Sequence, residues 1–307
     1  VISSLFKKSS VMSYLLSLAL LSLAVYSQGE TQEALILITA KKNHALFLLS
    51  LCMLSVDWSV KQRYWATQAN YHLFLFPFFI LSFPVETWGN WLLVFFFFLW
   101  ITFNYIVAID QSGGIITKVF NAFFFFYIGA LFFPQGILLL PLLWLLLLIK
   151  KSLTLQSFIL SLVPIIALYL IEVSVVYFLP NSVIIPPFDF SKMVLSLPLK
   201  EGFYSNLWWG TMLILSLFAV LKHYIDMGTR SASYGGGMIC LFIMTVMAIL
   251  FGVFFQSQSS FAWTLFLMNL TALLTRLFEG INRLWLREAF FYVIIALLLL
   301  GKYGFPF

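Results

Sequence analysis

Charged side chains are scarce in this chain of 307 residues, because Asp, Glu, Lys and Arg together make up only 9% of it. An ordinary soluble domain carries about 25% charged residues. Hydrophobic residues make up 63% of the chain, and so little charge does not cover the surface of a soluble body of this size. The composition therefore excludes an ordinary soluble domain.

Histidine and cysteine are also few. The three histidines, His44, His72 and His223, are widely separated, which excludes the histidine cluster that a membrane di-iron oxygenase or desaturase requires and argues against a haem held by two histidines. Cys52 and Cys240 both fall inside apolar runs, where a cysteine usually packs as a small apolar residue. We therefore predict no metal site and no cofactor.

Catalytic and nucleotide-binding motifs are missing as well. The sequence has no G-x-S-x-G, no H-E-x-x-H and no C-x-x-C. The pair Gly113-Gly114 lacks the G-K-[ST] ending of a phosphate-binding loop, so we expect no ATP-driven pump. The net charge of +6 comes from basic residues in short connections, where they set membrane topology, and we expect no binding of nucleic acid.

Long apolar runs fill the chain instead. They extend over about 15 to 25 residues, the length needed to cross the hydrocarbon core of a bilayer. We predict an all-α, polytopic transmembrane helical bundle that forms a single domain over residues 1–307, with about eleven spans and a range of ten to twelve. The predicted spans are 10–27, 44–57, 70–85, 89–109, 119–133, 136–149, 155–179, 206–222, 236–256, 260–278 and 288–301.

The basic residues give the orientation. With the N-terminus in the cytoplasm, this threading places twelve of the 17 Lys and Arg residues inside and five outside, as the positive-inside rule expects. We therefore predict a cytoplasmic N-terminus, whose basic and then apolar order we interpret as a retained first helix. The longest outward loop is predicted over 181–205, and a flexible inward loop over 223–235 because Gly235 to Gly237 disfavour a helix.

Glu172 is the carboxylate that the threading places within a span, in the stretch LYLIEVSVVYFLP. A charge at that depth costs a few kcal/mol or more, so it is expected to have a partner. Asn104 and Asn269 lie at comparable predicted depth and are candidate partners. The sequence leaves two roles open for Glu172. It either fixes packing or contacts another subunit, or it serves as a proton relay, an ion site or a lipid-headgroup contact.

A second pair of carboxylates lies in the predicted outward connection between the first two spans. Glu30 and Glu33 are one helical turn apart, so they share a face of any helix formed there. A carboxylate in this place is the catalytic base or metal ligand of membrane glycosyltransferases that use polyprenyl-phosphate sugars. Lys41 and Lys42 would then meet the lipid phosphate. The alternative is an ordinary exposed acidic loop.

Two basic and aromatic stretches are predicted on the inner face. Lys61, Arg63 and Trp65 follow the second span, and their expected roles are topology and headgroup binding, or docking of a partner. Four charged residues recur at spacings of three and four over 275–288, which predicts an amphipathic helix in the inner interface. Lipid anchoring and partner docking both remain open for these four, which are Arg276, Glu279, Arg283 and Arg287.

Three stretches resemble an uncharacterised family of Bacteroidota polytopic inner-membrane proteins that is sometimes loosely labelled carotene-monooxygenase-like. They are SSLFKKSSVMSYLL, KVFNAFFFFYIGALFFPQGILLLPLLWLLLLIKK and RLFEGINRLWLREAFFYVIIALLLL. The resemblance implies the cytoplasmic membrane of a Gram-negative cell and a role in envelope biology. It carries no catalytic residues over to this chain, and the scarcity of histidine argues against oxygenase chemistry.

The sequence favours a non-catalytic integral inner-membrane subunit or scaffold of a larger envelope assembly, serving protein export, motility or surface-polymer biogenesis. Its expected partners are the lipid bilayer and other inner-membrane subunits, with polyprenyl or phospholipid headgroups as further ligands. The first alternative is a polyprenyl-phosphate-dependent glycosyltransferase-like enzyme that uses Glu30 or Glu33. The second is a proton-coupled secondary transporter with Glu172 as its coupling site.

Overall fold

The structure is a computed structural model of the chain. It describes residues 6, 10–27, 35–62, 69–82, 91–111, 114–178, 203–227, 232–255 and 263–303. Within the helices, many side chains also lie outside the description, and those of Lys41 and Glu172 are among them.

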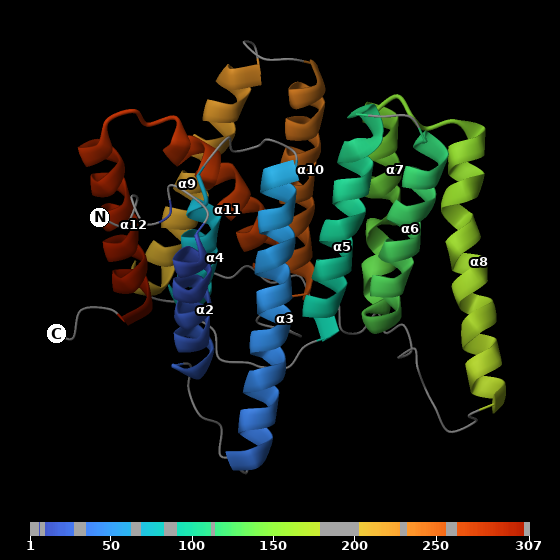
Figure 1. The fold of residues 1–307 in the computed structure, drawn as a ribbon, viewed down its shortest axis with the longest axis horizontal. Helices are drawn as coiled ribbons and strands as arrows, with labels where there is room; N and C mark the ends of the chain where they lie inside the picture. Colours follow the sequence, from blue (N-terminus) through green and yellow to red (C-terminus); the bar gives the residue numbers. More distant parts are fainter. Residues whose placement is uncertain are drawn as a thin grey trace.

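Every regular element of the described residues is helical, which confirms the all-α prediction (Figure 1). The α-helices are α2 (Val11–Tyr26), α3 (Leu35–Gln62), α4 (Tyr71–Ser82), α5 (Trp91–Val107), α6 (Ile115–Phe132), α7 (Leu140–Ile149), α8 (Leu155–Phe178), α9 (Phe203–Met227), α10 (Ala232–Phe255), α11 (Thr264–Glu279) and α12 (Leu284–Tyr303). Two 3-10 helices, η1 (Ala108–Gln111) and η2 (Pro134–Leu139), follow α5 and precede α7.

Five of these helices are long and apolar enough to cross a membrane. The qualifying segments are Lys42–Lys61 of α3, Ile115–Phe132 of α6, Asn206–Ile225 of α9, Gly237–Phe254 of α10 and Leu284–Lys302 of α12. This length and composition indicate a multi-pass membrane protein. The number of spans and the orientation of the N-terminus stay predictions.

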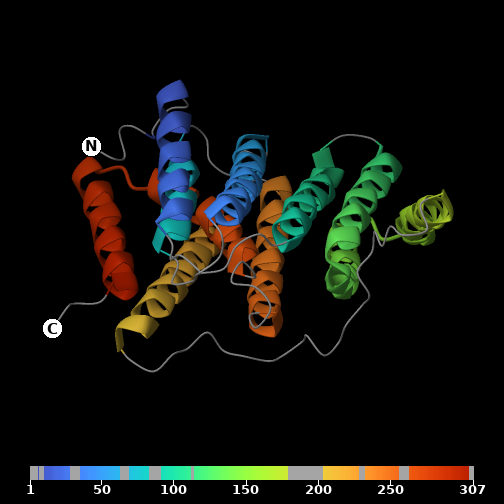
Figure 2. The same ribbon diagram turned by 90° about the horizontal axis from the view of Figure 1, so that it is seen from below.

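The helices form an elongated row, with α12 near one end and α8 at the other (Figures 1 and 2). Helix α11 lies in the interior of the row, where it packs against α4, α9 and α10. Its side chains from Thr264 to Arg276 are all buried. A helix covered on all sides has no face for lipid or water, so α11 is the buried helix around which α4, α9 and α10 pack.

Helix α3 is much longer than the predicted second span, 44–57. Polar residues such as Lys42 and Asn43 interrupt the apolar run, and the sequence therefore indicates a later start. In the structure, Tyr26 at the end of α2 donates a hydrogen bond to the Asn43 side chain, and the Lys42 ammonium lies 5.8 Å from the centre of the Tyr26 ring. These contacts accommodate the polar residues within the helix.

The predicted inward loop over 223–235 is also shorter in the structure. Helix α9 continues to Met227 and α10 begins at Ala232, so Gly235 to Gly237 lie in the opening turns of α10. A glycine costs about 1 kcal/mol in a helix relative to alanine. A backbone group without a hydrogen bond costs several kcal/mol in an apolar environment. The helix therefore forms in spite of its glycines, because it satisfies these backbone groups.

The predicted amphipathic helix over 275–288 is interrupted. Helix α11 ends at Glu279, Gly280 caps it with its N–H donated to the Arg276 carbonyl, and α12 begins only at Leu284. The four charged residues therefore do not share one helical face. The turn separates Arg276 and Glu279 from Arg283 and Arg287.

Candidate functional site

A buried carboxylate joins three helices near one end of α3. We call Tyr14 of α2, Asp57 and Lys61 of α3, and His72 of α4 the Asp57 cluster. The Tyr14 hydroxyl donates to Asp57 Oδ2 at 2.7 Å, and Lys61 Nζ donates to the same oxygen at 2.9 Å. His72 Nε2 lies 2.7 Å from Asp57 Oδ1, and Lys61 also donates to the Tyr14 hydroxyl. One carboxylate thus accepts from three side chains.

The Asp57 cluster leads from the interior to the surface. The His72 side chain is 1% exposed, that of Asp57 is 10% exposed, and that of Lys61 is 40% exposed. Because a carboxylate faces Nε2, we assign the proton of the neutral imidazole to that nitrogen, which leaves Nδ1 as the acceptor. Among the described residues, nothing bonds to Nδ1 although it is buried.

The Asp57 cluster combines neighbours within one helix with a residue from the next helix. Asp57 and Lys61 are one helical turn apart in α3, so their side chains share a face. His72 is the second residue of α4, so the return of the chain brings it beside the last turns of α3. The start of α4 is held in place because the Asn70 N–H donates to the Phe6 carbonyl at 2.8 Å.

A second polar contact ties α5 to α3. The Asn104 side-chain amide donates to the Ser59 hydroxyl and, at 2.9 Å, to the carbonyl of Trp100. The indole of Trp100 donates to the Ser55 carbonyl at 3.1 Å. These bonds join Asn104 to α3, whereas Glu172 belongs to α8.

The other predicted partner, Asn269, lies in the central helix α11 and is fully buried. Within the described part of the chain, neither Nδ2 nor Oδ1 of Asn269 has a hydrogen-bond partner. A buried amide without partners costs about 1–3 kcal/mol.

Residues 169–178, the end of the 24-residue helix α8, hold Glu172; they follow the buried Leu168, and we call them the C-terminal half of α8. Helix α8 packs along α6, and its lower end in Figure 1 extends beyond the lower ends of α6 and α7. Every described side chain of this half is exposed; these are Tyr169, Leu170, Ile171, Val173, Ser174 and Tyr177. The side chain of Glu172 itself lies outside the described residues, while its backbone continues the helix.

The charged residues predicted at the inner interface divide into two groups. Arg276 Nη1 donates to Glu279 Oε2 at 2.7 Å, and both side chains are largely buried. The Arg287 guanidinium is buried 5.5 Å from the centre of the Tyr71 ring, whereas Arg283 is exposed. The structure thus presents Lys61 and Arg283 at the surface and turns Arg276 and Arg287 into the protein.

Four predicted site residues, Glu30, Glu33, Arg63 and Trp65, lie outside the described residues. The glycosyltransferase hypothesis for the first two therefore stays a prediction. In the part of the chain that the structure describes, no group of three or more His, Cys, Asp or Glu side chains could hold a metal ion.

Sequence reasoning missed the link between Asp57 and His72. The available signal was a carboxylate in the last turns of an apolar helix with a lysine four residues later, followed by a histidine at the opening of the next apolar run. A scan against protein-family models and searches of curated proteins and of solved structures found no match for this chain. The resemblance seen in the sequence stays a prediction, and a functional argument has to start from the residues themselves.

Proposed function

We propose that this protein is a non-catalytic integral subunit of a larger membrane assembly and that the C-terminal half of α8 binds a transmembrane helix of another protein. One observation carries the proposal: Glu172 lies in a helix segment whose described side chains are all exposed. The assembly that we propose lies in the bacterial cytoplasmic membrane and serves an envelope process such as protein export, motility or surface-polymer biogenesis.

A carboxylate within a bilayer needs a polar partner. In lipid, an acidic residue almost always faces a helix bundle or a polar partner, because a charge in hydrocarbon costs a few kcal/mol or more. Lipid chains offer no hydrogen-bond donor. A helix that presents a lysine, arginine, histidine or asparagine at the depth of Glu172 supplies one.

Packing also favours a transmembrane helix as the partner of this segment. Helices associate in membranes through close packing and a few polar contacts, since lipid is as apolar as the helix surface. In the C-terminal half of α8, the exposed apolar residues Ile171 and Val173 flank Glu172 in the sequence, so we expect the segment to offer both. The partner we propose is therefore a single transmembrane helix with a donor side chain on its contacting face.

Co-purification tests this proposal. The tagged protein is extracted from its native membrane in mild detergent, and the recovered proteins are quantified for wild type, Glu172→Ala and Ser174→Ala. We expect a stoichiometric partner whose recovery falls at least tenfold in Glu172→Ala and is unchanged in Ser174→Ala, which alters an exposed polar side chain on the same segment. Equal recovery in the two variants would refute the proposal.

A specific observation favours a second function, proton-coupled transport. The Asp57 cluster connects the buried His72 to the exposed Lys61 through one carboxylate. Buried ionisable residues in membrane helices often mark proton paths. This function predicts proton flux in proteoliposomes that Asp57→Asn abolishes and Glu279→Gln leaves unchanged. Flux equal to that of empty liposomes would remove it.

A further inference from the structure

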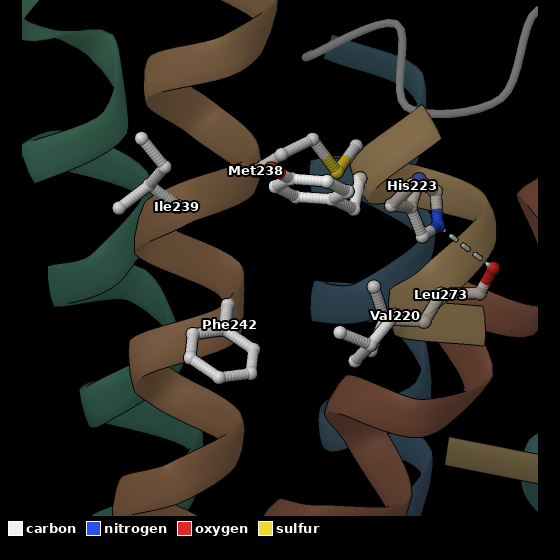
Figure 3. Close-up of a pocket in the computed structure, with 7 residues that line it drawn as sticks. Val220, His223, Met238, Ile239, Phe242 and Leu273 are labelled. Carbon is white, nitrogen blue, oxygen red and sulfur yellow. Dashed lines mark hydrogen bonds between the residues drawn. The ribbon is translucent and has the colours of Figure 1, made fainter. Parts of the chain in front are cut away.

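Helices α9, α10 and α11 enclose a cavity of about 160 Å³ (Figure 3). Helix α9 contributes Val220, His223 and Tyr224, helix α10 contributes Met238, Ile239 and Phe242, and α11 closes the inner wall with Leu273. The His223 ring is held in place because its Nε2 lies 3.1 Å from the Leu273 carbonyl oxygen. The cavity wall is otherwise built from apolar side chains.

The mouth of this cavity lies between two helix segments that are long and apolar enough to cross a membrane. Val220, His223 and Tyr224 lie in the membrane-crossing segment of α9, and Met238, Ile239 and Phe242 lie in that of α10. Tyr224, Ile239 and Phe242 are exposed on this side, whereas Met238 is buried at the base of the cavity. In a bilayer crossed by both segments, the mouth would therefore open toward the headgroup-side carbons of the lipid rather than toward the bilayer centre.

The size of the cavity sets the size of its occupant. An apolar cavity of roughly 150 Å³ accepts a molecule of the size of benzene, so this cavity has room for a short stretch of a hydrocarbon chain. It is too small for a phospholipid headgroup. Methionine adapts its shape to irregular apolar partners, and Met238 lies where the end of a flexible chain would lie.

The depth of the cavity in the bilayer indicates which kind of hydrocarbon chain could enter it. The α9 residues of the cavity are within the last turns of the segment Asn206–Ile225, and the α10 residues are within the first turns of Gly237–Phe254. The cavity thus lies near one membrane face. The carbons found at that depth are those of phospholipid acyl chains.

We infer that the cavity between α9 and α10 is a binding site for one acyl chain of a phospholipid, separate from the C-terminal half of α8. The chain enters between Tyr224 and Ile239 and lies against Met238, Phe242 and Leu273. This inference does not depend on the partner proposed for α8. It predicts one lipid that exchanges more slowly than the lipids covering the rest of the surface.

The test uses the full chain in nanodiscs of phosphatidylglycerol and phosphatidylethanolamine that contain a phospholipid with a photoreactive diazirine in its acyl chain. After illumination, mass spectrometry measures labelling at Tyr224, Met238 and Phe242 relative to Leu213 and Leu217. These two leucines are exposed on α9 but do not line the cavity. We expect at least fivefold enrichment at the cavity residues.

Two blocking variants and one control variant make the result specific. Ile239→Trp narrows the mouth at an exposed position and is expected to lower labelling of Met238 at least fivefold, whereas Leu217→Trp places the same side chain outside the cavity and leaves it unchanged. Val220→Trp fills the cavity from α9 and serves as an independent second blocking variant. Equal labelling of cavity and control residues, or labelling that both blocking variants leave unchanged, would overturn the inference.

A competition arm distinguishes the source of the chain. Polyprenyl phosphate added at a tenth of the phospholipid concentration is expected to leave the labelling of Met238 unchanged. Loss of labelling at that ratio would overturn the assignment to an acyl chain and would identify the site as one for an isoprenoid chain.

Discussion

Replacing Asp57 by alanine tests the energetics of the Asp57 cluster. The change leaves His72, with a side chain that is only 1% exposed, without its carboxylate and removes the acceptor of Tyr14. Leaving a buried donor without its acceptor costs about 1–3 kcal/mol, and a hydrogen bond to a charged group contributes about 1.5–3 kcal/mol. We expect Asp57→Ala to lower the free energy of unfolding by about 3 kcal/mol, the upper end of both ranges, because His72 and Tyr14 lose their shared acceptor together.

Lys61→Ala is the matched control in the same cluster. The Lys61 side chain is 40% exposed, so solvent screens its pairing with Asp57, and such pairs contribute about 0–1 kcal/mol. Tyr14→Phe removes one hydrogen bond and is expected to lie between the two variants.

The assay is equilibrium unfolding by SDS in mixed micelles, followed by tryptophan fluorescence. The expected order of destabilisation is Asp57→Ala, then Tyr14→Phe, then Lys61→Ala. Equal losses for Asp57→Ala and Lys61→Ala would refute the reasoning, since they would show that burial of His72 does not set the cost.

Three further predictions concern packing and buried polar groups. Gly301→Ala is expected to lower the free energy of unfolding by about 1–3 kcal/mol because of overpacking, since a Cβ there would lie 2.9 Å from a main-chain nitrogen of α9. Gly210→Ala is the control, because nothing lies within 4 Å of a Cβ there, and the SDS unfolding assay compares the two variants. Asn269→Leu is expected to raise the unfolding free energy by about 1–3 kcal/mol because it removes an amide without partners, and a loss of stability would show that the amide has one. Asn104→Leu is expected to lower it by about 0.5–1.5 kcal/mol, the contribution of one hydrogen bond, because the Ser59 hydroxyl loses the bond from Asn104 and keeps those to Trp100 and Ser55; an unchanged value would contradict the link to α3.

Much of the fold could be predicted because membrane helices leave a local signal. Each of the eleven apolar runs corresponds to an α-helix in the described residues, since a span needs a continuous apolar stretch that the sequence displays directly. The ends of the helices were predicted less well. Helix α3 extends through Lys42 and Asn43, whose contacts with Tyr26 no local pattern encodes.

The candidate site was less predictable than the fold for the same reason. Asp57 and Lys61 are neighbours in one helix, but the approach of His72 and Tyr14 depends on how α2, α3 and α4 pack. Asn104 was predicted as a candidate partner of Glu172, and in the structure its amide donates to Ser59 of α3. Hydropathy gives depth along a span, whereas rotation about the helix axis is decided by packing.

The central claim is that a transmembrane helix of another protein covers the C-terminal half of α8. The most direct measurement is site-specific photo-crosslinking in native membranes, with a diazirine amino acid at Val173 on α8 and, as a control, at Leu217 on α9; both side chains are exposed. We predict that Val173 crosslinks to one partner protein, that Leu217 does not, and that Glu172→Ala removes the crosslink. Crosslinking of both positions to lipid alone would contradict the claim.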